Sequence, residues 1–193
     1  MVIGVLALQG AFEAHCNCLR AIGVDPCYVR KNADLEKCLG LIIPGGESTA
    51  MMHLIEAVGM RAALLDFAQE RAIWGTCAGL ILLAKVVENA SFTPLGLLNI
   101  RVKRNAYGRQ IASFSTSITI HPDITTPALF IRAPQITEIL SKEVEVLATH
   151  AGMPVFVSEQ NLFATTFHPE LTGNLFIHNL FLQKIQEKAY VYV

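Results

Sequence analysis

The stretch "IWGTCAGLILLAK", residues 73–85, carries the pattern that decides the fold. A short apolar segment leads into a second one, and Cys77 stands at the join between two small residues. Gly75 and Gly79 lie two positions to either side of Cys77, so the chain before and after the turn can approach closely. The pattern predicts a buried strand, a sharp turn and a helix.

Before this stretch, apolar segments of strand length alternate with helical segments in the same way. This alternation predicts a parallel sheet with helices on both faces. The first expected strand, residues 2–8, is a continuous apolar run, which is typical of a strand buried on both faces. The expected strands are residues 2–8, 26–30, 40–46 and 72–76. The expected helices are residues 12–22, 33–38, 49–58, 61–69 and 78–85, with Ser48 as the N-cap of the third.

The pattern changes from about residue 97. Residues 97–120 alternate, are rich in Thr, Ser and β-branched side chains, and hold a Tyr107-Gly108 turn, so they predict antiparallel strands. Further strands are expected at residues 128–134, 144–150, 153–160 and 162–168, and an amphipathic helix at 173–189. We therefore expect one α/β domain, residues 1–193. It is a three-layer sandwich whose mostly parallel central sheet has an antiparallel extension.

Composition excludes several classes of protein. Hydrophobic residues make up 52 % of the 193 residues and charged residues 16 %, which predicts a large buried core. The formal charge is −1 and Lys and Arg are not clustered, which disfavours a nucleic-acid binder. No uninterrupted apolar run is long enough to span a bilayer, and the first residues lack the features of a signal peptide.

The cysteines indicate a reducing compartment. There are five, an odd number, which favours reduced thiols and a cytoplasmic location. Cys16, Cys18, Cys27 and Cys38 do not follow the spacing of a metal site, so we interpret them as small buried or half-exposed side chains. We predict neither a metal nor a cofactor for this chain.

Cys77 is a candidate nucleophile. The helix that begins at Ala78 presents free N–H groups and a positive dipole end beside the sulfur, and both favour the reactive thiolate. The alternative is a small apolar residue packed in a tight crossover. The choice between them depends on whether a base lies nearby.

His168 is the best candidate for that base. It ends an apolar strand and is followed by Pro169 and Glu170, whose carboxylate can fold back onto the imidazole. We interpret Cys77, His168 and Glu170 as a Cys–His–Glu triad. The alternative is that His168 is an exposed histidine before a turn. We interpret His178 as structural. The remaining histidines are interpreted as surface or partner-facing residues: His15, His53, His121 and His150.

The second glycine turn, "PGGEST" at residues 44–49, also follows a strand. Because ligands gather at the carboxyl ends of parallel strands, the N–H groups of Gly46 and Ala78 are candidate oxyanion donors. An ordinary turn with a Ser cap is the alternative. A phosphate loop is disfavoured because the motif lacks the lysine and Glu47 would repel a phosphate.

These motifs resemble a known family. "PGGEST", "GTCAG" and "FHPE" in this order resemble the class I (triad) glutamine amidotransferases, which have a flavodoxin-like fold. "GVLALQGAFEAH", "RNAYGRQ", "FIRAP" and "FHPELT" narrow the resemblance to the glutaminase subunits of pyridoxal 5′-phosphate synthase, the PdxT/Pdx2 family. The resemblance covers nearly the whole chain. The segment "AHCNCL" and the apolar "AMMHLIEAVGM" depart from the family pattern.

The resemblance implies a reaction and a set of residues. L-Glutamine is hydrolysed to L-glutamate and ammonia, with Cys77 as nucleophile, His168 as acid and base, and Glu170 orienting His168. A glutamyl thioester is the expected intermediate. The glutamine contacts that the family implies are Gly46, Glu47, Ser48, Arg104, Ile131 and Arg132.

The resemblance also implies a partner, a synthase subunit with a (β/α)8 barrel, in an assembly of twelve and twelve subunits. The glutaminase is expected to be poorly active alone, because the turn at Gly45 and Gly46 needs the partner to set it. The Gln9-Gly10 turn and the first helix are candidates for the docking face. The open alternatives are an amidotransferase that serves another acceptor, a non-catalytic relative and a cysteine peptidase of related architecture.

Overall fold

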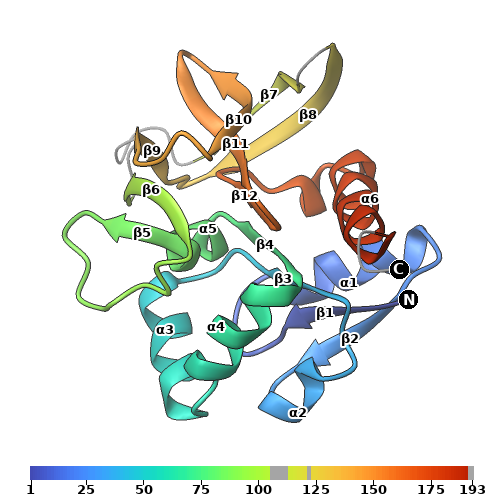
Figure 1. Cartoon of the computed structure of the whole chain (residues 1–193). Helices are drawn as coiled ribbons and strands as arrows, with labels where there is room; N and C mark the ends of the chain where they lie inside the picture. The colour runs from blue at the N-terminus through green and yellow to red at the C-terminus, as the bar shows by residue number, and fades with distance from the viewer. Residues whose placement is uncertain (105–112, 121–122, 191–193) are drawn as a thin grey trace.

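The computed structural model describes residues 1–104, 113–120 and 123–190. They form a nine-stranded sheet in the order β2-β1-β3-β4-β12-β11-β10-β7-β8 (Figure 1). The first five strands in this order are mutually parallel: β2 (Asp25–Val29), β1 (Val2–Leu6), β3 (Gly40–Ile43), β4 (Ala72–Thr76) and β12 (Leu162–Thr165). The antiparallel extension is β11 (Met153–Glu159), β10 (Glu145–His150), β7 (Ser113–Ile120) and β8 (Ile124–Ile131). The expected fold class is confirmed.

Helices cover both faces of the parallel strands. Figure 1 shows α1 (Phe12–Ala21) and α6 (Phe176–Tyr190) on one side, and α3 (Ser48–Ala57) and α4 (Arg61–Glu70) on the other. The short helices α5 (Ala78–Leu83) and α2 (Asn32–Leu35) contact α3 and α4, respectively. Two buried clusters lie on the two faces, because successive side chains of a strand point in opposite directions. Ile73 belongs to one cluster and Trp74 to the other.

A second, three-stranded sheet corrects two predictions. The helix expected at 78–85 ends at Leu83, and Ala84 starts strand β5 (Ala84–Val87), whose β-branched valines favour extended backbone. This strand pairs in parallel with β6 (Leu98–Lys103), which pairs antiparallel with β9 (Gln135–Ile139), a strand that was not expected. Residues 97–120 therefore contribute to two sheets, and the Tyr107-Gly108 turn lies outside the described residues.

The start of α3 corrects the expected cap. Glu47, not Ser48, is the N-cap residue, and its carboxylate accepts hydrogen bonds from the N–H groups of Thr49 at 3.0 Å and Ala50 at 2.7 Å. A carboxylate at this position satisfies N–H groups that lack partners in the first turn of the helix. In the described part of the chain, no helix is long and apolar enough to cross a membrane.

Candidate active site

The turn that carries Cys77 is strained, as its sequence predicts. Cys77 has φ 49° and ψ −102°, outside the regions that non-glycine residues favour. Its N–H donates to the carbonyl of Thr165 at 2.8 Å, which holds the turn against β12. A Cβ atom on Gly75 would lie 2.6 Å from the Gly79 carbonyl carbon, and one on Gly79 would overlap the Ile43 carbonyl. Both glycines are required for this close approach.

His168 lies beyond the end of β12, which stops at Thr165 and not at His168 as expected. Its backbone N–H donates to the carbonyl of Leu129 at 2.8 Å, so strand β8, at the edge of the sheet, fixes its position. Nδ1 of His168 lies 2.7 Å from Oε1 of Glu170, in the short helical turn Pro169–Leu171. Both side chains are buried, so this contact is shielded from water.

The electrostatics of this group favour an imidazolium at position 168. Burial alone would lower the pKa of His168, but hydrogen bonds to Cys77 and Glu170 outweigh burial and raise the pKa to about 10. Burial acts to raise the pKa of Glu170, but the nearby His15 and His168 hold it below its usual value. His168 is therefore held as an imidazolium, with the carboxylate of Glu170 on Nδ1 and Cys77 hydrogen-bonded to the same side chain.

Cys77 and His168 open onto a pocket of about 500 Å³. Every residue that the family resemblance implies for glutamine lines this pocket, together with Ala78. The carbonyl oxygen of Ile131 lies 3.9 Å from Sγ of Cys77, and Arg132 has a positive φ of 44°. The complete lining is Gly10, Ala11, Gly45, Gly46, Glu47, Ser48, Cys77, Ala78, Ile81, Arg104, Ile131, Arg132, His168 and Leu171.

Glu47 and Arg104 form an ion pair on the pocket wall. An N–H of Arg104 donates to Oε1 of Glu47 at 3.1 Å, and the guanidinium lies over the ring of Phe92. The pKa of Glu47 is lowered: its partial burial acts to raise it, but the hydrogen bonds at the start of α3 and the charge of Arg104 outweigh that. The pocket thus presents a carboxylate and a guanidinium side by side.

The glycine turn after β3 is held by the loop after β1. The carbonyl of Gly45 accepts a hydrogen bond from the N–H of Ala11 at 2.9 Å, and Oε1 of Gln9 accepts one from the N–H of Glu47 at 3.1 Å. Gly10 has φ 99° and packs directly on the Gly45 carbonyl, a position that a side chain would block. The Gln9-Gly10 segment therefore controls the conformation of the turn beside Cys77.

His15 corrects the sequence interpretation. It was expected on the surface, yet its exposure is 0 % and its Nε2 lies 3.5 Å from Oε2 of Glu170. The spacing of His15, Cys18 and Leu19, at three and four residues along the helix, is the signal that places His15 on the buried face. His178 is buried beside it, as a structural residue would be. His53 is exposed and His150 is half-buried, while His121 lies outside the described residues.

The remaining cysteines are free thiols. Cys16, Cys18 and Cys38 are buried and Cys27 is half-buried, which confirms their expected environment. Burial raises the pKa of Cys16 to about 11 and that of Cys38 to about 12, so both thiols stay protonated at neutral pH. Over the described ranges, no group of three or more His, Cys, Asp or Glu side chains could hold a metal ion.

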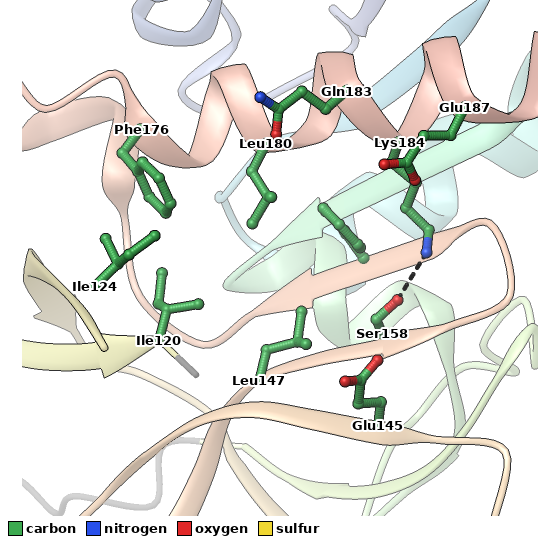
Figure 2. Close-up of a pocket in the computed structure, with 11 residues that line it drawn as sticks. Ile120, Ile124, Glu145, Leu147, Ser158, Phe176, Leu180, Gln183, Lys184 and Glu187 are labelled. Carbon is green, nitrogen blue, oxygen red and sulfur yellow. Dashed lines mark hydrogen bonds between the residues drawn. The ribbon is translucent and has the colours of Figure 1, made fainter. Parts of the chain in front are cut away.

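A smaller pocket of about 210 Å³ lies between α6 and the antiparallel strands (Figure 2). Ile120, Leu147 and Leu180 line it, and Nζ of Lys184 donates to the hydroxyl of Ser158 at 3.0 Å. None of the described residues that line it was predicted for the site. The predicted nucleophile, its predicted base and the implied substrate residues therefore lie together in the larger pocket.

Known proteins share both the sequence and the fold of this chain. It is 46 % identical over 189 residues to the pyridoxal 5′-phosphate synthase subunit PdxT of Thermotoga petrophila, covering 96 % of this chain and all of the relative. The subunit of the same name from Pasteurella multocida is 45 % identical, covering 94 % and 95 % of the two chains. The crystal structure of a glutamine amidotransferase superposes with a TM-score of 0.92 at 39 % identity, covering 96 % of this chain and all of that one. Residues 5–187 match the SNO glutamine amidotransferase family, and the chain belongs to this family.

Proposed function

We propose that this chain hydrolyses L-glutamine to L-glutamate and ammonia and supplies the ammonia for the synthesis of pyridoxal 5′-phosphate. The observation that carries the proposal is the contact of Cys77, His168 and Glu170 at the wall of a pocket of about 500 Å³. The similarity to subunits of pyridoxal 5′-phosphate synthase supports the proposal that the ammonia is used to make pyridoxal 5′-phosphate.

Cys77 forms the covalent bond in the first half of the reaction. Its thiolate attacks the carbon of the side-chain amide, and the negative charge moves to the amide oxygen. The imidazolium of His168 gives its proton to the departing nitrogen, which leaves as ammonia when the C–N bond breaks. A glutamyl thioester on Cys77 remains. The raised pKa of His168 supports this role, because the proton is in place before the attack.

Water completes the second half. The neutral imidazole of His168 takes a proton from a water molecule, which attacks the thioester carbon and releases glutamate as the C–S bond breaks. Glu170 accepts a hydrogen bond from Nδ1 of His168 throughout, so the other ring nitrogen faces Cys77. The buried position of this carboxylate makes the interaction stronger than it would be in water.

The oxyanion of each tetrahedral intermediate is assigned to the N–H groups of Gly46 and Ala78, which flank Cys77 in the pocket. The α-carboxylate of glutamine is assigned to Arg104 or Arg132, and its α-ammonium to Glu47. Ser48 and Ile131 complete the contacts. The Glu47–Arg104 pair supports this assignment because it is complementary to the two charges of a free amino acid.

The acceptor is a synthase subunit, for which we propose a (β/α)8 barrel in an assembly of twelve synthase and up to twelve glutaminase subunits. The Gln9-Gly10 loop supports partner-dependent activity, because it holds the turn at Gly45 and can be moved by a protein that docks on it. We further propose that the whole chain, residues 1–193, acts as one domain in the cytoplasm.

Release of glutamate tests the proposal. Glutamate and ammonia are measured from glutamine with the chain alone, with a pyridoxal 5′-phosphate synthase subunit added, and with Cys77→Ala in place of the native chain. We expect release that depends on the synthase subunit and disappears in the variant. Release by Cys77→Ala, or no release with any of several synthase subunits, would contradict the proposal.

A further inference from the structure

Glu170 uses only half of its carboxylate to hold His168. Oε1 binds Nδ1 of His168 at 2.7 Å, while Oε2 is buried and has no hydrogen-bond partner among the residues that the structure describes. A buried carboxylate oxygen without a donor is costly, because the group has lost its water. A second group that stabilises this oxygen would also fix the direction of the first.

His15, on α1, faces that oxygen. Its Nε2 lies 3.5 Å from Oε2 of Glu170 and 3.2 Å from the hydroxyl oxygen of Thr76. Thr76 is the residue that precedes Cys77 in β4. The same imidazole nitrogen therefore contacts the strand end that carries the nucleophile and the carboxylate that orients the base.

His178, on α6, determines which nitrogen of His15 carries the proton. Its Nε2 lies 3.1 Å from Nδ1 of His15, and its Nδ1 has no hydrogen-bond partner among the described residues. A buried N–H without an acceptor costs more than a bare ring nitrogen, so the proton of His178 belongs on Nε2. It donates to Nδ1 of His15, which leaves the proton of His15 on Nε2, the nitrogen that is hydrogen-bonded to Thr76 and lies 3.5 Å from Oε2 of Glu170.

Both rings are neutral and firmly packed. Burial lowers the pKa of His15 and lowers that of His178 to about 3. Trp74 contacts the two rings nearly edge to face, with centroids 5.4 Å from His15 and 4.9 Å from His178. A neutral donor in a fixed orientation can align a carboxylate without cancelling the charge that His168 needs.

We propose that His15 is a positioning residue for glutamine hydrolysis: its Nε2–H lies between the hydroxyl of Thr76 and the second oxygen of Glu170, and His178 fixes the tautomer that puts the proton there. The contact of 3.5 Å shortens to a hydrogen bond when glutamine binds, because such bonds are often long before substrate binds. This inference rests on the proposed glutaminase activity.

Two substitutions of His15 separate this role from packing. The amide nitrogen of His15→Gln lies near the position of Nε2 and keeps a donor toward Glu170, whereas that of His15→Asn lies near Nδ1 and does not. With a synthase subunit present, we expect kcat about 10-fold lower in His15→Asn, with KM for glutamine unchanged, and kcat within about threefold of native in His15→Gln. His53→Gln, at an exposed position on α3, is the matched control and should have native kinetics.

Alkylation of Cys77 by iodoacetamide gives a second measurement that needs neither glutamine nor partner. Followed by peptide mass spectrometry near pH 7, it should be slower in His15→Asn than in His15→Gln, because a displaced His168 stabilises less thiolate. A difference here with no glutamate release by the native chain would refute the glutaminase proposal alone.

Equal kcat in the two His15 variants, or a change confined to KM, would overturn the inference. If His15→Asn does not fold, as judged by thermal unfolding, His178→Leu replaces it. That variant removes the donor that fixes the tautomer of His15 and should lower kcat at constant KM. A native kcat in His178→Leu would likewise overturn the inference.

Discussion

The substitution Gly45→Ala tests how closely the backbone at Gly45 packs against the imidazole of His168. The φ of Gly45 is not positive, so its backbone would accept alanine; only the space around it requires glycine. An added Cβ would lie 3.0 Å from Nδ1 of His168, closer still to Cε1 of the same ring, and 3.4 Å from Cβ of Cys77. The neighbour that must move in Gly45→Ala is therefore the imidazole.

The expected loss follows from that movement. Ordinary contact begins at 3.4 Å, so the ring must shift, and a misplacement of about 1 Å costs roughly 100-fold in rate. The strain of overpacking costs about 1–3 kcal/mol of stability, which leaves the chain folded. We expect kcat for glutamate release, measured with a synthase subunit present, to fall roughly 100-fold at 25 °C.

Gly40→Ala is the matched control. Gly40 begins β3 and is equally buried, and its Cβ would lie 3.1 Å from Cγ1 of Ile185 and closer to the terminal Cδ1. The flexible end of Ile185 gives way there, so stability falls slightly and kcat stays native. Equal losses of kcat in the two variants, or a native kcat in Gly45→Ala, would refute the argument that the imidazole has no free space.

Three further predictions follow from other contacts. The pKa of His168 is raised to about 10, so the stability that its protonated ring contributes is complete below about pH 6.5 and is lost as the pH rises through 10. Urea unfolding of the native chain at increasing pH should show this loss of stability. The loss should be smaller in Cys77→Ala, which lacks the hydrogen bond that raises the pKa. An equal pH dependence of the free energy of unfolding in the native chain and in Cys77→Ala would count against the Cys77–His168 contact. Gly79→Ala places a Cβ 2.8 Å from the carbonyl carbon of Ile43 and should lower the free energy of unfolding by about 3 kcal/mol or more, measured by urea denaturation; a loss below about 0.5 kcal/mol would show that the turn can open. Arg104→Gln should raise KM for glutamine at least about 10-fold while changing stability by less than about 1 kcal/mol, because the Glu47–Arg104 pair is partly exposed; a native KM would remove Arg104 from the substrate contacts.

The parallel half of the fold was predictable because it depends on local patterns. Apolar runs of strand length, separated by helical segments, allow few arrangements, and each expected strand of that half is present. The small sheet of β5, β6 and β9 was not predictable. "LLAK" continues a helical pattern, and only pairing with residues far along the chain draws Ala84 into a strand.

The site shows the same division. Cys77, Gly46 and His168 lie in the turns that follow strands, and the local sequence already indicates these turns. His15 lies within a helix, and no local signal joins it to Glu170, 155 positions later. The contact exists because α1 crosses beneath the turn that follows β12, which is a property of the assembled sheet. The sequence also did not predict Glu47 as the N-cap of α3, because serine is a more common N-cap residue than glutamate and Ser48 is the next residue.

The most direct test of the central claim is capture of the covalent intermediate. The chain is mixed with a synthase subunit and glutamine, quenched in acid within the first turnovers, and analysed by intact and peptide mass spectrometry. We expect a mass increase equal to one glutamyl group on the peptide that contains Cys77, and none in Cys77→Ala. A glutamyl group on another residue, or glutamate release with no adduct on Cys77 at any quench time, would contradict the account.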